Sequence, residues 1–140
     1  LVAAALVAPF GALSDRFGRR AVIAPALVAF AALFWLFMHR LAAEPDIANL
    51  WLLQGVGALF AAFAGPVPAL MTEIFPVYLR ATGASLAFNL AGALFGGLAP
   101  AINGALVQAT GNAAAPAYYI AFVAVLGLIG LAGLPRRSPA

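Results

Sequence analysis

The fold follows from residues 21–38, which read AVIAPALVAFAALFWLFM and contain no charged side chain. Two longer uncharged runs lie downstream, at residues 47–72 and 81–135. A bilayer core about 30 Å thick is crossed by roughly 20 helical residues, so the first two runs each predict one membrane-spanning helix. Backbone polar groups in lipid must pair internally, and we therefore expect every span to be helical.

The third run is too long for one span and is interrupted by QATGN at residues 108–112, shortly before Pro116. Gly and Asn end helices readily, whereas Pro favours the first helical turn. We therefore expect two spans here, at residues 82–107 and 116–134. By contrast, residues 1–12 would rise only about 18 Å as a helix, too little to cross. Because no Met begins the chain, we expect residue 1 to lie within a helix of a longer protein.

The composition excludes a soluble globular domain. Hydrophobic residues make up 66% of the 140 residues and charged residues only 8%, against about 25% charged in soluble domains. The absence of cysteine excludes disulfides and thiolate metal sites. The basic residues are separated by apolar blocks instead of forming a patch, so we expect a lipid bilayer as partner and no nucleic acid.

The arginines are divided unequally between the two sides of the predicted spans. Six fall on one side: Arg16, Arg19, Arg20, Arg80, Arg136 and Arg137. Arg40 falls on the other side, near two acidic residues. Since arginine-rich short segments are retained in the cytoplasm, we expect the side with six arginines, including the tail 135–140, to be cytoplasmic.

One polar segment stands out among the apolar runs. Residues 11–20 read GALSDRFGRR and place one acid among three arginines. We expect a tight turn at residues 14–20 in which Asp15 accepts hydrogen bonds from the arginines. The alternative is a solvated loop that only fixes the topology.

This decapeptide resembles the G-x-L-x-D-R-x-G-R-R signature loop of the major facilitator superfamily. Residues 73–85, EIFPVYLRATGAS, resemble the junction after helix ten in the same superfamily. The continuation is similar to helices eleven and twelve of its metabolite:proton symporter family, through Asn89, Gly92, residues 95–97, Pro100 and residues 116–119. That family includes bacterial carriers for proline/betaine, α-ketoglutarate, citrate and shikimate.

The resemblance implies an all-α integral membrane fold, the C-terminal portion of a twelve-helix carrier. The implied parts are the end of helix eight (1–12), the cytoplasmic signature loop (14–20), helix nine (21–38), helix ten (47–74), helix eleven (82–107), helix twelve (116–134) and a cytoplasmic tail (135–140). The implied function is proton symport of a small organic acid or zwitterionic metabolite across the bacterial inner membrane by alternating access. The N-terminal half of the carrier is then the partner, and the proton gradient the energy source without a cofactor.

The resemblance also implies a conformational latch, an ion-pair network that closes the cytoplasmic side. Its expected members are Asp15, Arg16, Arg19, Arg20, Glu73 and Arg80. Helices ten and eleven of the superfamily face the central cavity, which makes Asn89, Gln54 and Asn103 the substrate-cavity candidates. The alternative for these amides is hydrogen bonding between helices, worth about 1 kcal/mol in membranes.

The sequence gives no support for an enzyme, because it contains no phosphate-binding loop, no nucleophile paired with a base and no metal-ligand cluster. Two alternatives to a metabolite symporter stay open: a sugar-porter-type carrier, and a scaffold or carrier remnant that does not transport.

Residues 65–68, GPVP, predict an interruption of helix ten, because Pro removes a hydrogen-bond donor. Gly92 and Gly96 would admit a close helix neighbour, and together with Gly97 and Pro100 they allow helix eleven to bend. Helix nine carries bulky aromatics and no polar group between residues 21 and 38, so it is interpreted as lipid-facing. These aromatics are Phe30, Phe34, Trp35 and Phe37.

Overall fold

The computed structural model describes residues 2–44, 46–47 and 49–134, and within them all regular structure is helical. The elements in chain order are α1 (Val2–Phe17), α2 (Arg19–Ala43), α3 (Asn49–Ala64), α4 (Val67–Ile74), α5 (Arg80–Ala91), the π-helix η1 (Gly92–Gly97), α6 (Ala99–Thr110) and α7 (Pro116–Gly133). The expected tail at 135–140, with Arg136 and Arg137, lies outside the described residues.

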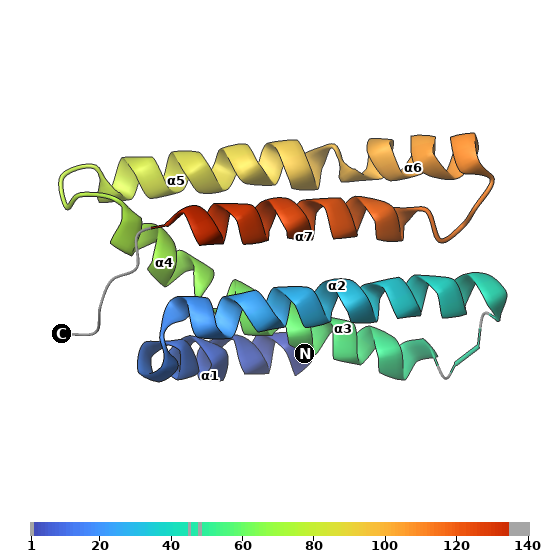
Figure 1. Cartoon of the computed structure of the whole chain (residues 1–140), viewed down its shortest axis with the longest axis horizontal. Coiled ribbons are helices and arrows are strands. Elements are labelled where there is room, and N and C mark those ends of the chain that lie inside the picture. Colours follow the sequence, from blue (N-terminus) through green and yellow to red (C-terminus); the bar gives the residue numbers. More distant parts are fainter. Residues whose placement is uncertain (1, 45, 48, 135–140) are drawn as a thin grey trace.

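Four helical stretches are long and apolar enough to cross a membrane, as the sequence predicted. They are Arg19–Ala43, Trp51–Ile74, Arg80–Thr110 and Pro116–Gly133. Helix α2 packs against α1 and α3 on one side and against α7 on the other. The rod formed by α5, η1 and α6 runs alongside α7 at the edge of the bundle (Figure 1). In the most apolar 18-residue stretch of this rod, no residue is buried within the chain.

The turn expected at residues 14–20 is much shorter in the structure. Helix α1 continues to Phe17 and α2 begins at Arg19, so only Gly18 separates them. Gly18 has φ 91°, a conformation that a residue without a Cβ adopts at no steric cost. Most of the charged decapeptide is therefore held on helices, which fixes where its side chains lie.

The helix expected at residues 47–74 is interrupted where the sequence predicted. Helix α3 ends at Ala64 and α4 begins at Val67, with the fully buried Pro66 at the break. The preceding Gly65 touches α1, since a Cβ there would overlap the Val7 carbonyl oxygen. At this break the backbone of α1 contacts that of Gly65, so the two segments cross closely. The break also gives α4 a different direction from α3.

The interpretation of helix nine as lipid-facing is wrong for two of its aromatic residues. The Phe30 ring lies 5.2 Å from that of Phe63 and 6.1 Å from that of Phe60, both on α3. The Trp35 ring packs edge-on against Tyr118 of α7 at 4.8 Å. An apolar side chain suits lipid and a neighbouring helix equally well, so composition alone could not distinguish the two surroundings.

Candidate functional site

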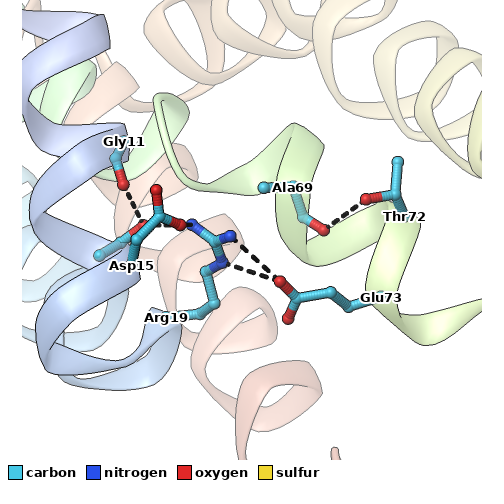
Figure 2. A network of polar contacts seen from close by, with 7 residues as sticks. Gly11, Asp15, Arg19, Ala69, Thr72 and Glu73 are labelled. Atoms are coloured by element: carbon cyan, nitrogen blue, oxygen red, sulfur yellow. Dashed lines mark hydrogen bonds and ion pairs between the residues drawn. The ribbon is translucent and has the colours of Figure 1, made fainter.

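The polar side-chain contacts between α1, α2 and α4 converge on Arg19 at the start of α2. One guanidinium nitrogen lies 2.5 Å from Oδ1 of Asp15 and donates a hydrogen bond to Oγ of Ser14 at 2.6 Å. Nε and the second terminal nitrogen both reach Oε1 of Glu73, each at 3.1 Å. Figure 2 shows Arg19 between Asp15 on α1 and Glu73 on α4. One side chain therefore joins the ends of α1, α2 and α4.

Ser14 holds the inner side of this network and was not expected from the sequence. Its hydroxyl donates to the Gly11 carbonyl at 2.7 Å and accepts from Arg19, and the residue is only 1% exposed. Ser14 occupies a variable position of the signature motif. The available signal was its spacing of three from Gly11, because a helical Ser can bond back to the carbonyl one turn earlier.

Glu73 reaches the network because the chain changes direction between α3 and α4, at Gly65 and Pro66. The redirected α4 carries Glu73 in its last turn, 54 positions after Arg19 in the chain. Arg19 is 18% exposed, whereas the side chains of Asp15 and Glu73 are 60% and 42% exposed. The carboxylates thus keep much of their hydration, and such pairs are weak enough to break and re-form during a conformational change.

The structure brings together three of the six expected latch residues, and it adds Ser14. Within the described part of the chain, Arg16, Arg20 and Arg80 make no ion pair. Arg16 and Arg80 are exposed, and one terminal nitrogen of Arg20 is enclosed without a hydrogen-bond partner there. Of the charged residues in the signature motif, Asp15 and Arg19 therefore belong to the network, whereas Arg16 and Arg20 make no ion pair within the described residues.

The three cavity candidates lie in different surroundings and do not form one cluster. Gln54 on α3 and Asn89 on α5 are exposed, and the Asn89 amide donates to the Ser85 carbonyl at 2.8 Å. Asn103 on α6 is half-buried, and its Oδ1 atom is enclosed without a hydrogen-bond partner in the described residues. Among those residues, no group of three or more His, Asp or Glu side chains is placed to bind a metal.

Comparison with known proteins places this architecture in one superfamily. Residues 1–140 match the Major Facilitator Superfamily. The chain is 42% identical over 125 residues to a citrate-proton symporter of Salmonella typhi, which covers 89% of this chain and 29% of that protein. It is 40% identical over 129 residues to a citrate-proton symporter of Klebsiella pneumoniae, covering 91% of this chain and 29% of that protein.

A proline/betaine transporter of Escherichia coli is 34% identical over 122 residues, covering 85% of this chain and 24% of that protein. No solved structure matches the chain. The chain thus spans less than a third of the length of these relatives, all of which are named as transporters. These relatives confirm the resemblance to metabolite:proton symporters. With its four apolar spans and a match along its whole length, the chain belongs to the Major Facilitator Superfamily.

Proposed function

We propose that this chain forms the C-terminal part of a proton symporter that moves a small carboxylate-bearing metabolite by alternating access. The observation that carries the proposal is the network around Arg19, which joins three helix ends in a chain similar to named proton symporters. Citrate, proline and betaine, the substrates in the relatives' names, all carry a carboxylate. The proposed substrate class is therefore a small organic acid or zwitterion.

The proposed orientation places the Arg19 network at the cytoplasmic face of a bacterial inner membrane. Arginine-rich ends of spans are retained in the cytoplasm, and Arg16, Arg19, Arg20 and Arg80 share the end that carries the network. The C-terminus then lies on the same side. No cofactor is required, because a proton gradient supplies the free energy.

The proposed mechanism uses the network to hold the cytoplasmic ends of helices eight, nine and ten as one unit. Secondary transporters of this type rock one repeat against the other around a central site. Because the network holds these helix ends together, they transmit that motion as a rigid unit. The exposed Arg16 and Arg80 are free to form ion pairs with acidic groups of the N-terminal half when the cytoplasmic side closes. Asn89, on the unburied face of α5, is the strongest of the three cavity candidates.

The experiment is uptake of labelled citrate and labelled glycine betaine by vesicles that contain the full-length carrier. We expect accumulation of one of the two, driven by an imposed proton gradient and abolished by a protonophore. Vesicles without the carrier are the control. Uptake that persists unchanged with the protonophore would contradict proton symport, and accumulation of a neutral sugar in place of both probes would favour the sugar-porter alternative.

A further inference from the structure

Helix eleven contains a π-helical segment that nothing in the proposed function requires. The six residues of η1, Gly92–Gly97, separate α5 from α6, and a bend at Leu98 follows. Short π segments within α-helices are rare and occur frequently at functional sites. A Cβ at Gly92 or Gly96 would meet no atom of the described chain within 4 Å. These two glycines are therefore not explained by a close helix neighbour in this part of the protein.

Pro100 leaves one backbone carbonyl of this segment without a donor in either helical register. In the π register the carbonyl of Phe95 would accept from the backbone N–H of position 100, and in the α register the carbonyl of Gly96 would accept from that same N–H. Because Pro100 has no backbone N–H, it donates a hydrogen bond in neither the π nor the α register. Because an unpaired carbonyl in lipid costs several kcal/mol, an outside donor decides which register is favoured.

Tyr119 of α7 supplies that donor to one of the two carbonyls. Its hydroxyl donates to the Phe95 carbonyl at 2.7 Å, 24 positions away in the chain, and the residue is 8% exposed. The bond satisfies the carbonyl that the π register leaves unpaired. The adjacent Tyr118 differs, because it is half-exposed and packs its ring against Trp35.

The register determines which face of helix eleven carries its polar residues. Asn89 and Asn103 lie 14 positions apart, about 3.9 α-helical turns, so an unbroken α-helix would place them on nearly the same face. A π turn takes up about one additional residue, which rotates everything beyond it by about 100°. In agreement, Asn89 is exposed while Oδ1 of Asn103 is enclosed.

We infer that Tyr119 is a positioning residue: its hydroxyl holds helix eleven in the π register and thereby keeps Asn89 on the substrate-facing side. This inference rests on the proposed function for the substrate and on the hydrogen bond to Phe95 for the register. Loss of the hydroxyl removes the preference for π over α. The two ends of helix eleven then rotate relative to each other, and substrate affinity falls while the folded bundle stays intact.

The test compares Tyr119→Phe with the matched control Tyr118→Phe in the full-length carrier. Spin labels at positions 86 and 108, on either side of η1, report the register through their distance distribution. A second pair at 104 and 108, both on α6, serves as the internal control. Uptake kinetics of the probe that the wild type accumulates, citrate or glycine betaine, give KM and Vmax.

For Tyr119→Phe we expect a shifted or broadened 86–108 distance and a KM raised about threefold or more, since membrane hydrogen bonds average about 0.6 kcal/mol. Vmax should stay within about twofold, the 104–108 distance should be unchanged, and Tyr118→Phe should match the wild type. An unchanged 86–108 distance, or a change in Vmax with constant KM, would overturn the inference. If the wild type accumulates neither probe, the proposed function fails, and the distance measurement still decides whether Tyr119 sets the register.

Discussion

Replacement of Arg19 by glutamine removes the side chain that joins three helix ends. Its contacts are of unequal strength. The hydrogen bond to the buried Ser14 hydroxyl is charge-assisted and worth about 1.5–3 kcal/mol. The exposed pair with Glu73 contributes about 1 kcal/mol at most, and the more exposed pair with Asp15, across the break between α1 and α2 at Gly18, about 0.5 kcal/mol. We therefore expect Arg19→Gln to lower the free energy of unfolding by roughly 2–4 kcal/mol.

Double-mutant cycles separate these contributions. Arg19→Gln is combined in turn with Glu73→Gln, Asp15→Asn and Ser14→Ala, and the free energy of unfolding of the purified full-length carrier is measured in mixed micelles. The coupling energy should fall in the order Ser14, Glu73, Asp15, because burial decreases in that order. The control is a double-mutant cycle that combines Arg19→Gln with a substitution of Gln108, an exposed residue on α6 for which we expect no coupling.

Two results would refute this reasoning. Coupling energies below about 0.2 kcal/mol for all three partners would mean that Arg19 does not join the helices in the folded carrier. A coupling to Asp15 larger than that to Ser14 would mean that charge, and not the buried hydrogen bond, dominates the network.

Two further predictions concern the helix crossing and the exposed acid. Gly65→Ala should abolish or strongly reduce the amount of folded protein in the membrane, because the new Cβ overlaps the Val7 carbonyl oxygen. Gly104→Ala is the control that we expect to be tolerated, since a Cβ there meets open space. Equal expression of the two variants would contradict the close crossing of α1 at Gly65. Asp15→Asn should lower the initial rate of uptake by about twofold or more at an unchanged amount of inserted protein, as expected for an ion pair of about 0.5 kcal/mol. Uptake equal to the wild type would remove Asp15 from the latch.

The spans and the break in helix ten could be predicted because each depends on local chemistry. Long uncharged runs have one stable form in lipid, and Gly65 followed by Pro66 interrupts a helix wherever it lies. The left-handed Gly111 that ends α6 likewise sits in the QATGN segment that marked the division between the last two spans.

The pairing of charges could be predicted only in part. Asp15 and Arg19 are neighbours on one polar segment, but Glu73 joins them through the redirection of α4, which depends on how α1 crosses helix ten at Gly65. The resemblance named six latch residues without their geometry, so it could not say that Arg16, Arg20 and Arg80 lie outside the internal network.

The register of helix eleven could not be predicted at all. Glycines at 92, 96 and 97 and Pro100 indicated a bend, but the choice of π register depends on a hydroxyl from α7. A Tyr near the end of a span is typical of the membrane–water interface, so the residue type alone does not indicate this role for Tyr119. Its burial and its hydrogen bond to the Phe95 carbonyl distinguish it from Tyr118.

The central claim is that the Arg19 network lies at the cytoplasmic ends of membrane-spanning helices. It is tested most directly by labelling single cysteines with a membrane-impermeant maleimide in right-side-out and inside-out vesicles of the full-length carrier. Suitable positions are Phe17 and Tyr78 at the network end and Trp51 at the opposite end, all largely exposed. We predict that positions 17 and 78 react in inside-out vesicles alone and position 51 in right-side-out vesicles alone. The reverse pattern, or labelling of all three from one side, would contradict it.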